Sequence, residues 1–261
     1  MIGISWYFGF DINPIERAKL LKEYGFDCVI TNTDKKFNKQ NGKFKKQIKL
    51  FKDFGLKHSS LHMQYKSCEL AKFWQHGKCG DKMLKSIIQD IKMTKKHGFT
   101  CLVVHLKGSF SKVGISRLYK VLDACEKYGV DIAVENLDNE KVFFKVMDTI
   151  NHPNLKFCYD SGHHNIWMKN IDLLEKYGNR LVALHLHNNM GKYDSHSLSK
   201  QGTVDWDKLA QKLANLPQVN LDYELLMKEK SSKMSADKVL KECLKEARHL
   251  QERIEYYKNK T

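Results

Sequence analysis

The sequence predicts an α/β protein built as a single (β/α)8 barrel over residues 1–261, and three observations support this fold class. Strand-like apolar runs and helical patterns alternate strictly, which indicates a parallel sheet. Eight such pairs fit the length of the chain, as in a closed barrel. Several of the strand-like runs are almost continuously apolar, as expected when helices cover both faces of a sheet. A doubly wound open sheet is the alternative, but the first strand is not followed by a glycine-rich phosphate loop.

Five similar short segments mark the ends of helices. Each combines charged residues, an aromatic residue or a histidine, a glycine and then an apolar run: KEYGFD, KDFGLK, KKHGFT, EKYGVD and EKYGNR. A glycine just past a helix end adopts the left-handed conformation at low cost, and nearby lysines suit the helix dipole. We therefore expect left-handed caps at Gly25, Gly55, Gly98, Gly129 and Gly178.

These signals place the elements in order along the chain. The apolar runs predict strands at 3–8, 26–32, 56–62, 99–106, 130–136, 155–163, 180–188 and 219–226. The helical patterns between and after them cover 14–24, 36–54, 81–98, 113–128, 140–150, 166–177, 205–214 and 234–258. Apolar periodicity is the basis for both assignments.

The connection at 63–81 is unusually long for a compact barrel, and such loops are usually functional. It contains Tyr65, Phe73, Trp74 and His76. We interpret it as a lid whose aromatic residues cover the ring of a small-molecule ligand, or stack on a base if the ligand is a nucleic acid. Packing against a neighbouring helix is the alternative.

The composition favours a cytoplasmic protein without a membrane segment. The seven cysteines are an odd number and several lie in predicted strands or helices, which fits reduced thiols. No apolar run approaches the roughly 20 residues of a membrane span. The net charge of +15 invites a nucleic-acid interpretation. However, the positive charge comes mainly from lysines spread over every predicted helix, which indicates a solvated surface, and arginine is the usual phosphate ligand.

Metal-binding residue types gather where the predicted strands end. They are His62, His105, Glu135, Asn136, Asp160, His163, His185, His187 and Glu224, joined by Asp194 and His196 in the loop after the seventh strand. The carboxyl ends of all barrel strands meet at one rim. Individually, a histidine could be an ordinary polar residue, Glu135 could hydrogen-bond within the barrel, and Asp160 could cap a helix. Together, buried charges of this kind predict a divalent metal site.

At this point the sequence resembles the xylose-isomerase-like TIM-barrel superfamily, which includes sugar-phosphate isomerases and epimerases, ketose 3-epimerases and endonuclease IV. The motifs that carry the resemblance are VEN at 134–136, DSGH at 160–163, HLHNN at 185–189, DSH at 194–196, GTVDW at 202–206 and the final Glu224. The resemblance spans essentially the whole chain. Its motifs are specific for the superfamily but do not choose among its activities.

The resemblance to ketose epimerases implies an enzyme that isomerises or epimerises a small sugar or sugar phosphate. Glu135, Asp160, His185 and Glu224 would hold one divalent ion, Mn, Co, Mg or Zn, which stabilises an enediolate. Glu135 and Glu224 would be the catalytic acid–base pair, one on each face of the substrate. The remaining substrate-binding candidates are His62, His105, His163, His187, Asn136 and Trp6. A homo-oligomer is possible.

The resemblance to endonuclease IV implies a different enzyme, a zinc phosphodiesterase acting on abasic DNA. Three zinc ions would be held by His62, His105, Glu135, Asp160, His163, His185, Asp194, His196 and Glu224. Against this alternative, LDNEK follows Asn136 where a glycine-rich run would be expected, and arginine is scarce. A non-catalytic sugar-binding barrel is the third possibility.

Overall fold

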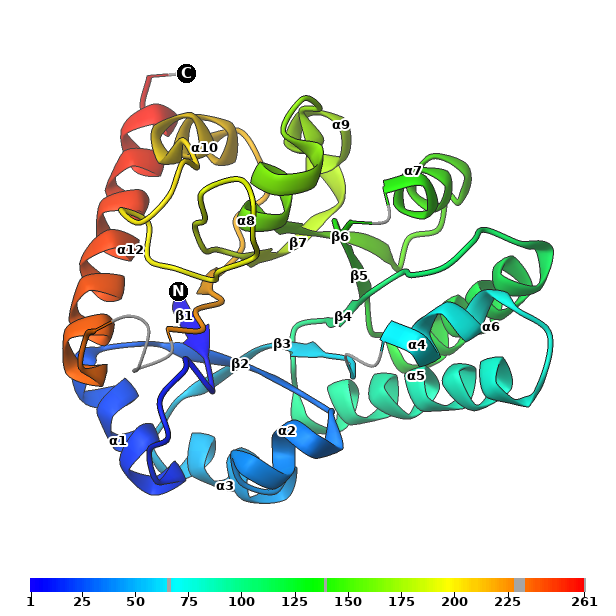
Figure 1. The fold of residues 1–261 in the computed structure, drawn as a ribbon, viewed down its shortest axis with the longest axis horizontal. Helices are drawn as coiled ribbons and strands as arrows, with labels where there is room; N and C mark the ends of the chain where they lie inside the picture. The colour runs from blue at the N-terminus through cyan, green and yellow to red at the C-terminus, as the bar shows by residue number, and fades with distance from the viewer. Residues whose placement is uncertain (65–66, 139, 228–232, 261) are drawn as a thin grey trace.

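The computed structural model describes residues 1–64, 67–138, 140–227 and 233–260 and confirms the (β/α)8 barrel (Figure 1). Eight parallel strands form one sheet in the order β7-β6-β5-β4-β3-β2-β1-β8. Their bounds are β1 Ile2–Ser5, β2 Cys28–Asn32, β3 Lys57–His62, β4 Leu102–Val104, β5 Ile132–Glu135, β6 Leu155–Asp160, β7 Leu181–His185 and β8 Leu221–Tyr223. Each lies within or at the edge of a predicted strand, and all eight are shorter than predicted.

The barrel closes between its last two strands. An isolated parallel bridge joins Leu186 to Tyr223. Around it, the N–H of Leu186 donates to the carbonyl of Asp222 at 2.8 Å, and the N–H of Glu224 donates to the carbonyl of Leu186 at 3.0 Å. This seam continues from the end of β7 and brings the residues that follow β7 beside those that follow β8.

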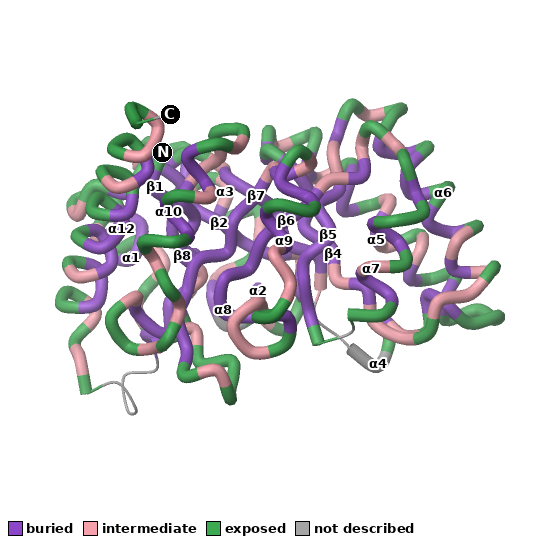
Figure 2. Tube along the Cα trace, turned by 90° about the horizontal axis from the view of Figure 1, so that it is seen from above, coloured by how far each residue is buried: buried purple, intermediate pink, exposed green. Residues whose placement is uncertain are grey.

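Helices surround the barrel, with their outer faces exposed and their inner faces buried against the strands (Figure 2). The long ones are α1 Pro14–Tyr24, α3 Phe44–Asp53, α5 Lys78–His97, α6 Lys112–Tyr128, α7 Glu140–Thr149, α10 Trp206–Ala214 and α12 Ala236–Lys258. Shorter ones are α2 Lys35–Gln40, α4 Ser67–Leu70, η1 Ala71–Trp74, α8 Ser161–His163, η2 His164–Met168, α9 Leu173–Tyr177 and η3 Gly178–Arg180. Within the described chain, no helix has both the length and the apolar character needed to cross a membrane.

The prediction of left-handed caps is confirmed at four of the five glycines and wrong at the fifth. Gly25, Gly55, Gly98 and Gly129 all have positive φ just past a helix. Gly178 instead has a right-handed φ of −59° and begins a further helical turn. Its missing side chain serves packing, because a β-carbon there would lie 2.5 Å from Cδ2 of Leu216.

Two predicted helices differ from the structure. The helix expected at 36–54 is divided into α2 and α3 by a turn in which Gly42 has a φ of +90°. This turn is tied to the barrel, since the carbonyl of Asn41 accepts a hydrogen bond from the indole of Trp6 at 3.0 Å. The helix expected at 166–177 is replaced by η2, a turn and α9, because Asp172 caps the N–H of Glu175 and starts a new helix.

The connection at 63–81 is largely helical and is held from α6. The guanidinium of Arg117 donates to the carbonyls of Phe73 and Gln75, each at 2.6 Å, and pairs with Asp81 at 2.9 Å. Phe73 and Trp74 are buried, and the Trp74 ring stacks on Phe110 at 5.6 Å, so these two residues pack against their neighbours. Tyr65 lies outside the described residues. The interpretation of this connection as a lid stays a prediction.

Candidate metal centre

The predicted residues from six strand ends do meet at one end of the barrel. At the centre of the group is His185, at the end of β7. Its Nδ1 lies 3.2 Å from Oε2 of Glu135 and 3.4 Å from Oε2 of Glu224. Together with Asp160, these residues offer ligand atoms that all lie within 4.8 Å of one another. This is the set predicted to hold one ion.

A second group forms on the other side of Glu135. The Nε2 atoms of His62 and His105 lie 3.0 Å apart, and they are 3.3 Å and 3.1 Å from Oε2 of Glu135. The three side chains are again close enough to share a metal ion. The carboxylate of Glu135 therefore belongs to both groups and could bridge two ions.

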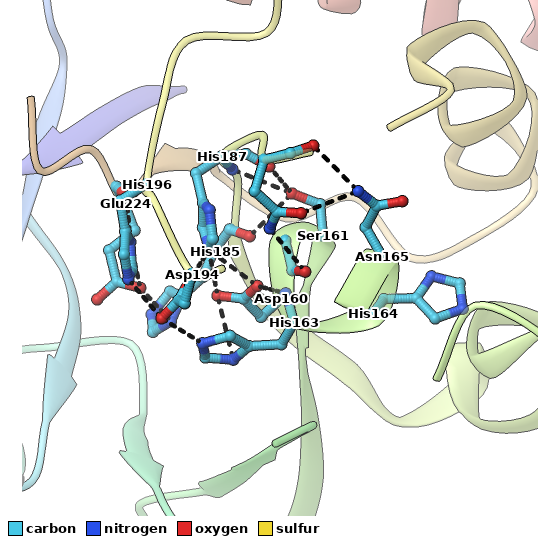
Figure 3. A network of polar contacts seen from close by, with 12 residues as sticks. Asp160, Ser161, His163, His164, Asn165, His185, His187, Asp194, His196 and Glu224 are labelled. Atoms are coloured by element: carbon cyan, nitrogen blue, oxygen red, sulfur yellow. Dashed lines mark hydrogen bonds and ion pairs between the residues drawn. The ribbon is translucent and has the colours of Figure 1, made fainter. Parts of the chain in front are cut away.

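A third group lies toward the loop after β7 (Figure 3). Oδ2 of Asp194 is 3.2 Å from Nε2 of His163 and 3.0 Å from Nε2 of His196. The ring of His187 stacks on that of His196 at 4.0 Å. These four side chains also converge closely enough for a metal ion. The neighbouring His164 points away from the cluster and is held by Tyr159 and by the carbonyl of Ile171.

The donors fit a divalent ion. Both ring nitrogens of His185 are buried, and neither makes a hydrogen bond of good geometry among the described atoms, although Nδ1 lies within ion-pair distance of Glu135 and Glu224. An unsatisfied buried polar group is costly, and coordination to a cation is one way to satisfy it. Imidazole and carboxylate ligands together are typical of zinc and similar divalent metals.

The charges of the site are strongly coupled. Burial alone would raise the pKa of Glu135, but the histidines around it outweigh burial and hold the pKa well below its usual range. Conversely, burial would lower the pKa of His185, yet Cys158, Glu224 and Glu135 raise it well above normal. The carboxylate of Asp194 is the main cause that raises the pKa of His196 to about 9, against the effect of burial. The site therefore favours the protonated form of His163, His185 and His196, whereas burial lowers the pKa of His105.

Asp160 acts at the start of a helix as well as in the cluster. Its Oδ1 accepts the backbone N–H of His163 at 2.7 Å, which is the capping role considered for it. Its Oδ2 lies 3.1 Å from Nε2 of His187. The close approach of His187 depends on Gly162, since a β-carbon there would lie 1.9 Å from Cε1 of His187. The DSGH motif therefore positions His163 through the cap at Asp160, and it makes room for His187 through Gly162.

Two predicted substrate-binding residues contact Asp160 and do not line the cavity of the site. Asn136 is fully buried, donates from Nδ2 to the carbonyl of Asp160 at 2.9 Å and accepts the N–H of Asp160 at 2.8 Å. His187 is also fully buried and faces Asp160. Their contacts are those of residues that position Asp160. Trp6 does line the cavity, although its side chain is covered from solvent.

A cavity of about 500 Å³ opens above the metal-ligand residues. This volume is typical of a small-molecule site. Tyr7, Phe37, Trp167 and Leu226 contribute to its wall, and none of them was singled out from the sequence as part of the site. No local motif marks these residues, because they reach the cavity only through the path of the loops after the strands.

A family comparison agrees with the fold. Residues 18–242 match the model of the xylose isomerase-like TIM barrel. The chain belongs to this family. Membership in the xylose isomerase-like TIM barrel family confirms the predicted resemblance.

Curated relatives of the chain match it only over part of their length. An uncharacterized protein of Sinorhizobium fredii is 35% identical over 97 residues, which cover 34% of this chain and 31% of that protein. An uncharacterized protein of Methanocaldococcus jannaschii is 25% identical over 112 residues, which cover 39% of this chain and 38% of that protein. These matches therefore assign no activity.

Solved structures of other xylose isomerase-like barrels superpose over nearly the whole chain. A D-tagatose 3-epimerase-like protein has a TM-score of 0.76 at 18% identity, covering 99% of this chain and 98% of its own. The IOLI protein, with a zinc atom bound, also has a TM-score of 0.76 at 18% identity, covering 98% and 99%. The 3-keto-D-glucoside 4-epimerase of E. coli has a TM-score of 0.68 at 16% identity, covering 96% and 98%. At such low identity the likeness establishes the fold.

Proposed function

We propose that this protein is a divalent-metal-dependent isomerase or epimerase that acts on a small sugar or a related hydroxycarbonyl compound. The observation that carries the proposal is the position of Glu135 and Glu224, which both approach His185 at the base of the small-molecule cavity. The names of the similar structures, several of them sugar epimerases, support the same class of reaction.

Glu135, Asp160, His185 and Glu224 are the residues that would hold the ion. When bound, a divalent ion supplies a Lewis acid that polarises a carbonyl oxygen and makes the adjacent C–H more acidic. The partners of Asp160 support this assignment, because Asn136 holds the backbone of Asp160 and His187 contacts its carboxylate. His163 and His196 lie toward the cavity and are suited to orient substrate oxygens.

The proton transfer itself is assigned to the two glutamates. The low pKa of Glu135 keeps it ionised at neutral pH, which is the form that a proton acceptor requires. Glu224 comes from a different part of the barrel and is more accessible, with 15% of its side chain exposed against 1% for Glu135. A carboxylate that removes a proton from one face and another that returns it to the opposite face invert the carbon between them.

The test is proton exchange in deuterated water. The protein loaded with manganese is incubated with a panel of ketoses, and deuterium at carbon is followed by NMR. We expect incorporation at the carbon next to the carbonyl, and loss of at least about a hundredfold in rate for Glu224→Gln. Glu252→Gln, an exposed glutamate on α12, is the control. Absence of deuterium from every ketose would remove this proposal.

A second candidate function is favoured by the two additional groups of ligands. Together, the three groups of candidate ligands contain all nine residues that the resemblance to endonuclease IV implies. This points to a trinuclear centre and phosphodiester hydrolysis, for which clustered ions supply an activated water. Metal analysis of protein purified without added metal separates the two candidates. About three zinc ions per chain with nicking of an abasic duplex supports the second, whereas one ion without nicking removes it.

A further inference from the structure

The wall of the cavity above the metal-ligand residues is formed mainly by apolar side chains. Trp6, Tyr7 and Phe37 come from the segments after β1 and β2, and Leu137, Trp167 and Leu226 come from the segments after β5, β6 and β8. A ligand that reaches beyond the metal centre would therefore contact aromatic and aliphatic surface in several directions.

Part of this wall is fixed from behind. The guanidinium of the buried Arg17 lies 5.0 Å from the ring of Trp6 and 5.4 Å from that of Tyr7. Tyr7 in turn meets Phe37 edge to face, with 6.1 Å between the ring centroids. Residues whose orientation is held in this way offer a preformed surface, which lowers the cost of binding.

The outer part of the wall is left open to solvent. Trp167 and Leu226 both line the cavity, and each has 37% of its surface exposed. The Trp167 ring also lies 4.9 Å from that of His163, so it stands directly beside the third group of ligands. Large apolar side chains at the mouth of a cavity gain from burial by a ligand.

Polar partners for a ligand are scarce in the same region. The hydroxyl of Thr31 donates to Gln47 at 2.7 Å, and the side-chain oxygen of Asn32 accepts the N–H of Asp34. Among the described residues that line the cavity, the one lysine or arginine is Lys107, and it is paired with Asp138 at 2.9 Å. Among the described residues of this wall, a phosphate group or a long row of hydroxyls would find few unengaged donors.

We propose that the substrate joins a short hydroxycarbonyl head to an apolar tail, either aryl or alkyl, and carries no phosphate. The head lies at the metal centre and the tail lies against Trp167 and Leu226, which are the residues that determine specificity. This assignment rests on the proposed isomerase function, because that function supplies the identity of the head.

The test compares three ketones with the same head. They are dihydroxyacetone, dihydroxyacetone phosphate and 1,3-dihydroxy-4-phenylbutan-2-one, each titrated calorimetrically into the full chain loaded with manganese. We expect the phenyl ketone to bind at least about tenfold more tightly than dihydroxyacetone. Trp167→Ala and Leu226→Ala should each reduce this advantage of the phenyl ketone over dihydroxyacetone severalfold. Tyr119→Ala, an exposed aromatic residue on α6, is the matched control and should change neither affinity.

Two results would overturn the apolar-tail proposal. One is binding of dihydroxyacetone phosphate that is as tight as that of the phenyl ketone, or tighter. The other is a preference for the phenyl ketone that is unchanged in both Trp167→Ala and Leu226→Ala. Exchange of carbon-bound hydrogen for deuterium is measured on the same samples. A phenyl preference without any exchange would support the apolar tail and count against the isomerase function, so the two proposals fail separately.

Discussion

The ring of His187 occupies the place where residue 162 would carry a side chain. A β-carbon added to Gly162 would lie 1.9 Å from Cε1 and 2.3 Å from Nδ1 of His187. Since His187 is fully buried and holds Asp160, the whole arrangement depends on this glycine.

Gly162→Ala should therefore displace His187 and weaken metal binding by about tenfold or more. The measurement is metal affinity by competition with a chelator. A double-mutant cycle supplies the control, because His187→Ala removes the ring that the methyl group would strike. In that background the added methyl group should have little further effect. An equal loss in both backgrounds would show that the collision is not the cause.

Glu246 of α12 should prove important for the loop that carries Asp194 and His196. Its carboxylate accepts the backbone N–H groups of Ser199 at 2.8 Å and Lys200 at 3.3 Å. Glu246→Ala leaves two donors without this acceptor, so we expect a loss of about 1–3 kcal/mol in the free energy of unfolding. Urea denaturation measures it. Glu252→Ala, an exposed position on the same helix, should change stability by less than about 0.5 kcal/mol.

Arg117 should control the order of the connection before α5. It donates to the carbonyls of Phe73 and Gln75 and pairs with Asp81. Arg117→Met keeps much of the packing but leaves the carbonyls unsatisfied, at a cost of about 2–4 kcal/mol. Hydrogen exchange of residues 69–81 should accelerate, whereas Lys120→Met, exposed on the same helix, should leave it unchanged. Unaltered exchange in Arg117→Met would contradict the clamping role.

The buried carboxyl of Asp90 should make the free energy of unfolding depend on pH. Burial raises the pKa of its carboxyl to about 7, although a hydrogen bond from Thr33 opposes the effect. Because the folded state holds this proton more tightly than the unfolded state, the stabilisation is complete below pH 4 and is lost as pH rises through 7. Asp90→Asn should therefore match the wild type at pH 4 and exceed it by up to about 4 kcal/mol at pH 8.

Urea denaturation across this pH range provides the measurement for Asp90. Asp123→Asn, at an exposed position on α6, should show no such dependence on pH. A constant difference between Asp90→Asn and the wild type would sink the prediction.

Metal uptake should release protons. Against the effect of burial, neighbouring carboxylates raise the pKa of His163 well above normal and that of His196 to about 9, and Cys158 together with Glu224 and Glu135 raises that of His185 well above normal. These rings hold protons at neutral pH when no ion is present, and a metal ligand must be neutral. The apparent affinity should therefore fall as pH is lowered from 9 to 6. Calorimetry in two buffers of different ionisation enthalpy counts the protons, and a count of zero would exclude these histidines as ligands.

The fold could be predicted from local signals because a (β/α)8 barrel repeats them. Glycine caps such as Gly98 and Gly129 mark where helices end and strands begin. The signal fails where a residue serves tertiary packing instead, as Gly178 does against Leu216. The division of α2 from α3 was missed for another reason, because the helical pattern on both sides was given more weight than the Asn41-Gly42 dipeptide, which is a local turn signal.

The candidate ligands could be found for a geometric reason, since residues at the carboxyl ends of parallel strands must meet at one rim. Sequence alone could not show which of them face the cavity. Asn136 and His187 have the right chemistry and position in the motifs, but in the structure both are engaged in hydrogen bonds with Asp160. The apolar wall was missed because Trp167 and Leu226 look like ordinary hydrophobic residues until the loops are folded.

The closure of the barrel gives a bound ion a mechanical role. In the described part of the chain, the ladder between β7 and β8 is reduced to the bridge of Leu186 with Tyr223. His185 ends β7 and Glu224 directly follows β8, and Nδ1 of His185 lies 3.4 Å from Oε2 of Glu224. An ion coordinated by both residues would cross-link β7 and β8 where a single bridge joins them. Chelation should then loosen the molecule there first, so that β7 and β8 part before any other pair of strands.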